Sequence, residues 1–177
     1  MKLSNTGVGI RSLRANTTGG NNTALGYYSL YLNTTGTQNT AIGAYALANN
    51  TVGTSNTAVG RSSLQINVSG GANSAFGHYS LLYNSGGSNN SAFGAGALQS
   101  NTTGDNNTAI GRNALYLNKT GASNVAVGVS ALQSNTSGSA NNAFGYRSLY
   151  ANITGSNNSA FGHYALRDNT IGVNSAA

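Results

Sequence analysis

The 177-residue chain holds few side chains that could perform acid–base or metal chemistry. It has two acids, Asp105 and Asp168, two histidines, His78 and His163, and no cysteine. Cleavage of a glycosidic bond normally needs a neighbouring pair of carboxylates, and a thiolate metal site or a disulfide needs cysteine. We therefore expect a protein that is not an enzyme and that uses no cofactor and no metal ion.

Tyrosine and arginine are the side chains best suited to binding. All ten tyrosines, six of the eight basic residues and both histidines fall at the same four places of a 17-residue repeat. Tyrosine offers a flat apolar face with a polar tip, and arginine binds phosphate or carboxylate through two parallel hydrogen bonds. These residues predict a tyrosine–arginine strip that binds cell-surface glycans or the phosphates of lipopolysaccharide. The strip comprises Arg11, Tyr28, Tyr31, Arg61, His78, Tyr79, Arg112, Tyr116, Tyr146, Arg147, Tyr150, His163, Tyr164 and Arg167.

The tyrosine–arginine strip has two other interpretations. Its tyrosines could stack on one another or line a contact between subunits while its arginines stay solvated. A net charge of +6 with interleaved tyrosine would also suit nucleic acid. Because the eight cations are spread thinly along the chain and no recognition helix is visible, we expect no nucleic-acid partner.

Glycine recurs every 17 residues, ten times without an insertion, from Gly9 to Gly162. We number the repeat positions after the first copy, so that position 9 comprises Gly9, Gly26 and their equivalents. Position 13 is leucine, position 16 is asparagine and position 19 is glycine in all ten copies. Position 5 is asparagine ten times, position 7 is alanine after Gly7, and position 12 is serine or alanine. The unit is N-x-A-Φ-G-x-x-[SA]-L-x-x-N-x-x-G-x-x, where Φ is apolar.

Seventeen residues are too few for a pair of helices but suit one coil of a solenoid, in which each copy stacks on the one before. β-Branched and aromatic residues between glycine and asparagine turns favour strands over helices. We predict an all-β protein, a β-solenoid of ten 17-residue coils that forms a single domain over residues 1–177 without distinct caps. Stacked strands lie about 4.8 Å apart, so ten coils give a rod of roughly 48 Å. The arc from position 10 to position 16 is either a second strand or a single helical turn.

Each invariant position predicts a structural role. Glycine at positions 9 and 19 suits a positive φ or a close approach of two backbones. The asparagines at positions 5 and 16 can stack along the rod, bond to the coils above and below, and satisfy turn backbone. Positions 7, 12 and 13 then form a thin core of alanine, serine and leucine.

Position 8 is apolar in every copy, and it points outward if the alanine at position 7 points inward, because side chains alternate along a strand. Ten such side chains would expose more than the few hundred Å² of apolar surface that a monomer usually tolerates. We therefore expect lateral association, with three parallel rods around an axis. The alternative is a kink at the position-9 glycine that turns both side chains inward. This position-8 stripe consists of Val8, Leu25, Ile42, Val59, Phe76, Phe93, Ile110, Val127, Phe144 and Phe161.

The segments NTALG, NTAIG, NTAVG and NSAFG resemble the repeat in head domains of YadA-like trimeric autotransporter adhesins. The whole unit, as in NTAIGAYALANNTVGTS, looks like repeats of bacterial and phage tail-fibre proteins. The resemblance covers essentially the whole chain, although the period is longer than that of the adhesin heads. It implies a homotrimeric, left-handed β-solenoid that serves in cell adhesion as an extracellular fibre on a bacterial surface or a virion. No apolar run reaches the roughly 18 residues of a membrane helix, so we expect no membrane span.

Two alternative functions use the same solenoid. Open ends would allow coils of different molecules to stack into a self-assembling extracellular filament with a mechanical role. Threonine occupies position 17 in six copies, and a regular threonine face would suit ice binding because stacked hydroxyls can order water.

Overall fold

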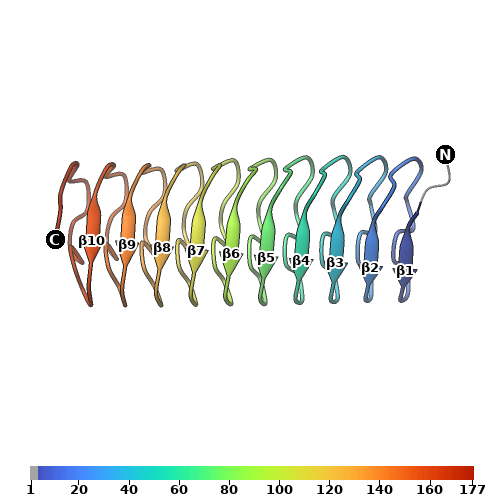
Figure 1. The fold of residues 1–177 in the computed structure, drawn as a ribbon, viewed down its shortest axis with the longest axis horizontal. Helices are drawn as coiled ribbons and strands as arrows, with labels where there is room; N and C mark the ends of the chain where they lie inside the picture. The colour runs from blue at the N-terminus through green and yellow to red at the C-terminus, as the bar shows by residue number, and fades with distance from the viewer. Residues whose placement is uncertain (1–3) are drawn as a thin grey trace.

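The structure is a computed structural model that describes residues 4–177, so the first three residues of the predicted 1–177 domain lie outside the described part. Ten short strands follow one another along a rod (Figure 1). Between residues 4 and 177 there is no helix. The strands are β1 (Thr6–Val8), β2 (Thr23–Leu25), β3 (Thr40–Ile42), β4 (Thr57–Val59), β5 (Ser74–Phe76), β6 (Ser91–Phe93), β7 (Thr108–Ile110), β8 (Val125–Val127), β9 (Asn142–Phe144) and β10 (Ser159–Phe161).

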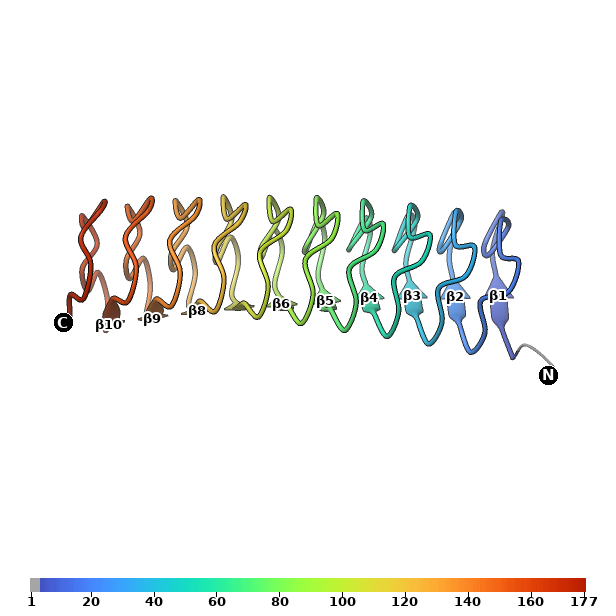
Figure 2. The same cartoon turned by 90° about the horizontal axis from the view of Figure 1, so that it is seen from above.

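All ten strands form one parallel sheet, and each strand pairs with the equivalent strand of the next coil. Ala41 lies beside Ala58, and Ala58 lies beside Ala75, so equivalent residues align without a shift. Seen from above, the same coil outline repeats along the rod (Figure 2). The predicted all-β solenoid, with its coils in register, is confirmed.

The core is a file of leucine flanked by small residues. The position-13 leucines from Leu30 to Leu149 are fully buried, as are the position-7 alanines from Ala41 to Ala160. At position 12, Ser29 is buried, as are Ala46, Ala97, Ala114 and Ala131. Burial of a leucine side chain contributes about 1.5–3 kcal/mol, so the leucine file is the main apolar stabilisation of a coil. The predicted core of positions 7, 12 and 13 is confirmed.

The arc from position 10 to position 16 contains two tight turns, so both forms expected from the sequence are wrong. The position-13 leucines have φ between +46° and +51°, and such left-handed values interrupt a right-handed helix or an extended strand. The Ser29 amide donates to the Gly26 carbonyl at 3.4 Å and closes the first turn. The Asn33 amide donates to the Leu30 carbonyl at 3.3 Å and closes the second. Between them, the Leu30 amide donates to the Ala46 carbonyl of the next coil at 3.1 Å.

Glycine at position 9 meets both conditions expected of it, whereas glycine at position 19 meets one. Gly94 has φ +136°, and a Cβ there would lie 2.7 Å from the carbonyl carbon of Gly111 in the next coil. Gly87, at position 19, lies outside the left-handed region. A Cβ on Gly87 would nevertheless lie 2.5 Å from the carbonyl oxygen of Gly104 and 2.6 Å from Asn84 Oδ1. Position 19 therefore requires glycine for close approach alone.

Two ladders of asparagine run along the rod and converge on the position-19 carbonyls. Asn73 and Asn84 both donate to the carbonyl oxygen of Gly87, each at 2.8 Å. Asn84 also donates to Asn67 Oδ1 at 2.9 Å, and Asn73 Oδ1 accepts the backbone amide of Asn90 at 3.0 Å. These asparagines are fully buried, where an unpaired amide would cost about 1–3 kcal/mol. The predicted stacking of asparagine at positions 5 and 16 is confirmed.

Candidate functional site

The position-8 stripe faces outward along the whole rod. In β5, Ala75 is buried while Phe76 is 36% exposed, and the exposed fraction reaches 62% at Phe161. The rings of Phe76 and Phe93 stack with centroids 4.9 Å apart, near the spacing of neighbouring strands. The predicted outward orientation is confirmed, and the alternative of a kink that turns both side chains inward is wrong.

The tyrosine–arginine strip lies on the arc of turns, and its N-terminal members cluster with Tyr27 and Tyr45, two tyrosines outside the predicted strip. The Tyr28 centroid lies 4.4 Å from that of Tyr27, 4.7 Å from that of Tyr31 and 5.6 Å from that of Tyr45. Arg11 lies over the Tyr28 ring, 5.3 Å from its centroid, and donates to the Tyr28 hydroxyl. These tyrosines stack on one another, as one alternative interpretation expects, and they also hold the guanidinium in place.

The C-terminal members of the strip form a second cluster. His163 stacks on Tyr146 at 5.1 Å between centroids and lies 4.2 Å from the ring of Tyr164. Arg147 lies over the rings of Tyr146 and Tyr150, at 5.3 and 5.2 Å from their centroids. A cation above a tyrosine ring contributes about 0.5–1 kcal/mol at an exposed site. The rings and the guanidinium of this cluster are therefore already engaged with one another, which leaves fewer of their faces free for a ligand.

The remaining members of the strip differ in how far they are engaged. Arg167 lies 5.3 Å from the Tyr164 centroid and pairs with Asp168 at 3.6 Å. His78 lies 3.7 Å from Tyr79 between ring centroids. Within residues 4–177, Arg61 and Arg112 form neither an ion pair nor a cation–π contact.

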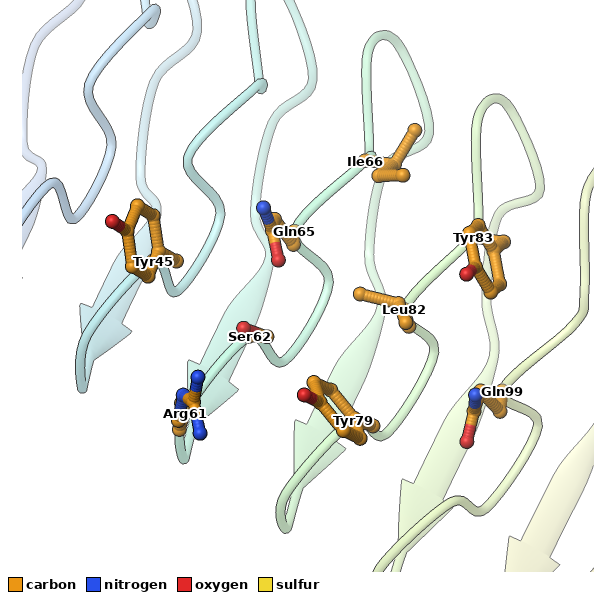
Figure 3. Close-up of a pocket in the computed structure, with 9 residues that line it drawn as sticks. All are labelled: Tyr45, Arg61, Ser62, Gln65, Ile66, Tyr79, Leu82, Tyr83 and Gln99. Atoms are coloured by element: carbon orange, nitrogen blue, oxygen red, sulfur yellow. The ribbon is translucent and has the colours of Figure 1, made fainter.

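A cavity of about 510 Å³ opens in the middle of the strip (Figure 3). Tyr45 and Tyr79 occupy position 11 two coils apart, and the residue between them at this position is Ser62. Because the buried Ser62 is small, the file of rings is interrupted and the space above it stays open. The cavity is lined by Tyr45, Arg61, Ser62, Gln65, Ile66, Tyr79, Leu82, Tyr83 and Gln99.

The predicted strip contained two of these lining residues, Arg61 and Tyr79. Sequence reasoning left Tyr45, Tyr83 and the glutamines out of the candidate site. The available signal was a serine at position 11 between two tyrosines, which marks a gap once the coils are known to stack in register. The structure thus divides the strip into two self-packed clusters and one open cavity.

The position-17 threonines use their hydroxyls within the rod. Thr34 Oγ1 donates to the Thr51 carbonyl at 3.0 Å, and Thr102 Oγ1 donates to the Lys119 carbonyl at 2.9 Å. A hydroxyl whose proton is already committed to the next coil is less able to order a water lattice. This arrangement weighs against the ice-binding alternative.

Two further searches of the structure bear on function. In the described part of the chain, no three acidic or histidine side chains gather closely enough to hold a metal ion. No helix between residues 4 and 177 has the length and hydropathy needed to cross a membrane. Comparisons of the chain with protein-family models, curated proteins and solved structures give no match.

Proposed function

We propose that the chain is a segment of a non-enzymatic adhesive fibre, in which three parallel copies associate through their position-8 stripes. The fibre acts outside the cell, on a bacterial surface or a virion. It presents the tyrosine–arginine strip to cell-surface glycans. The observation that carries the proposal is the outward position-8 stripe, of which eight members are exposed while Val59 and Val127 are half-buried.

The partner that fits this stripe is a second copy of the same chain. The apolar side chains recur once per coil, about 4.8 Å apart, over ten coils. A partner must present apolar groups at the same interval over the same length, and another rod of this sequence does so. Three copies around an axis bury the stripe on both flanks, which two copies would leave partly open. In register, such a trimer places Phe76 with Phe76 in one layer and Phe93 with Phe93 in the next.

The strip suits adhesion because its residues lie outside the stripe. Positions 10, 11, 14 and 15 form the turns, so association through position 8 does not use them. Their tyrosines and arginines give the fibre apolar faces and positive charge together, and the chain carries a net charge of +6. Anionic bacterial polysaccharides combine ring faces with negative charge, and both features match the strip.

Molar mass in solution tests the association. Light scattering on the wild-type protein is expected to give about 53 kDa, three times the chain mass of 17.8 kDa. The double variant Phe93→Lys with Ile110→Lys should fall to the mass of one chain, because six lysines would meet on the axis of the trimer. The matched control is Ala95→Lys with Val129→Lys at position 10, where arginine occurs naturally, and this variant should remain trimeric. A monomeric wild type would contradict the proposal, and open-ended polymers would favour the mechanical filament instead.

A further inference from the structure

We propose that the cavity above Ser62 binds a single sugar ring that carries an anionic group. This inference rests on the proposed function, because it names the ligand class and the place on the tyrosine–arginine strip. The cavity volume of about 510 Å³ lies within the range of about 300–1,000 Å³ for small-ligand sites.

The walls of the cavity provide apolar faces for the ring. Tyr45 and Tyr79 stand two coils apart, roughly 9.6 Å along the rod, on either side of Ser62 (Figure 3). The buried Leu82 and the partly exposed Ile66 add apolar surface to the lining. A pyranose has one face of C–H groups, which packs against a phenol ring as other apolar groups do. The walls thus suit a flat ring whose edge carries the polar groups.

The polar groups of the lining match the edge of a sugar. Gln65 and Gln99 each offer an amide that both donates and accepts, and the tyrosine and serine hydroxyls do the same. Sugar hydroxyls also donate and accept, so each can find a complementary partner here. Groups of this mixed kind, placed around an apolar wall, favour a polyhydroxylated ring over a purely aliphatic ligand.

Arg61 gives the cavity its preference for an anion. It is exposed at the cavity, and no acidic residue belongs to the lining. Arg11, Arg147 and Arg167 are held over tyrosine rings, whereas Arg61 has no such partner among residues 4–177. Its guanidinium is therefore available for two parallel hydrogen bonds to a carboxylate or a phosphate.

The same position elsewhere on the rod does not create an equivalent site. Ser130 also occupies position 11, but its neighbours at this position are Asn113 and Arg147 rather than two tyrosines. The lining of the cavity around Ser62 includes neither Ser130 nor these neighbours. The aromatic walls on both sides of the serine are therefore what makes the Ser62 cavity distinct.

The proposal is tested by titrating the folded protein with three monosaccharides and monitoring binding by NMR. Glucuronate and glucose 6-phosphate carry the two kinds of anion, and glucose is the neutral control. We expect at least one of the anions to bind about tenfold more tightly than glucose, as a charge-assisted hydrogen bond implies. Arg61→Gln should remove this preference while leaving weak binding of the neutral ring. Equal binding of all three sugars, or no binding at all, would overturn the proposal.

Ser62→Tyr tests the place of binding. Tyr45 and Tyr79 have φ +60° at this position and Ser62 has φ +56°, so tyrosine fits the backbone and should fill the cavity without unfolding the chain. Binding of the anionic sugar should fall at least tenfold. Ser130→Tyr, at φ +60°, is the matched control and should bind as wild type. If Ser62→Tyr left binding unchanged, the sugar would not bind in this cavity. The fibre proposal would be unaffected by that result, because molar mass and attachment to cells test it separately.

Discussion

The fixed and the variable positions of a coil differ in what their side chains touch. At positions 5 and 16, asparagine is hydrogen-bonded to the same residue of the next coil, and at positions 9 and 19 glycine lies so close to the next glycine that one added carbon would overlap it. At position 13, the buried leucine donates its amide to the position-12 carbonyl of the next coil. At positions 10, 11, 14 and 15, the side chains lie on the turns and contact one another or solvent. Position 11 accordingly holds side chains as different in size as those of Gly96 and Tyr79. The fixed positions build the rod, and the variable positions leave room to select a ligand.

The largest effect should come from Gly94→Ala. Its Cβ would lie 2.7 Å from the carbonyl of Gly111 at a φ that disfavours alanine, so we expect a loss of more than about 4 kcal/mol of stability, or failure to fold. Gly162 has φ +130° with nothing within 4 Å of its Cβ direction. Gly162→Ala should therefore cost about 1–3 kcal/mol, from backbone conformation alone. Thermal unfolding of both variants measures the difference, and equal effects would show that stacking does not enforce glycine.

Asn84→Ala should be the next most destabilising change. It removes two hydrogen bonds that the Asn84 amide donates and one that its oxygen accepts from Asn101, so we expect a loss of about 3 kcal/mol. The matched control is Asn49→Ala, because Asn49 is partly exposed, lies outside the left-handed region, and has Ala151 at the equivalent position of a later coil. The control should change stability by less than about 1 kcal/mol in the same denaturation experiment. If the control lost as much stability as Asn84→Ala, the asparagine ladder would not be a special source of stability.

Arginines of the strip should separate into stabilising and binding residues. Arg147→Ala removes two cation–π contacts and should lower stability by about 1 kcal/mol. Arg61→Ala with Arg112→Ala should leave stability within about 0.5 kcal/mol of wild type, because neither side chain has such a contact. The same double variant should bind surfaces coated with lipopolysaccharide at least about tenfold more weakly. If this variant attached as well as wild type, the arginines of the strip would not contribute to adhesion.

The smallest effect, and the one stabilising change, is expected for Gly7→Ala. Gly7 occupies the position where every other coil has alanine, and its φ is not left-handed. A Cβ there would lie 3.1 Å from Ser12 Oγ, the same pair of residue types that Ala24 and Ser29 form in the next coil. We expect a gain of about 0.5 kcal/mol from reduced freedom of the unfolded chain. Slower amide hydrogen exchange in the first coils of the variant than in the wild type would show this gain in stability.

The repetitive part of the fold was predictable because each coil carries the same signal. Leucine at position 13, asparagine at positions 5 and 16, and the outward position 8 all follow from a constant spacing of 17 residues. The turns from position 10 to position 16 were not predictable, because leucine prefers helices and strands. Here Leu30 is held in the left-handed region by backbone bonds to the next coil and by burial in the core. Tertiary contacts overrule local preference at this position.

The candidate site was predictable only in its residue types. Tyrosine and arginine marked the strip, but the sequence could not show which arginines tyrosine rings already engage. Arg147 has tyrosines close by in the sequence and Arg61 does not, but only the folded coil shows that the rings of Tyr146 and Tyr150 lie against the Arg147 guanidinium. The cavity depends on a difference between adjacent copies, Ser62 between two tyrosines. A consensus of the ten copies does not show such a difference between adjacent copies.

The bonds between coils point along the rod, as in the amide of Leu81 that donates to the carbonyl of Ala97 at 3.0 Å. Each coil is bonded to the coil before it and the coil after it, so a pull on the two ends loads these junctions in series. The junction that opens first frees 17 residues, which extend to roughly 55 Å before the next coil bears the load. Under tension the rod would lengthen in equal steps and dissipate energy at each one.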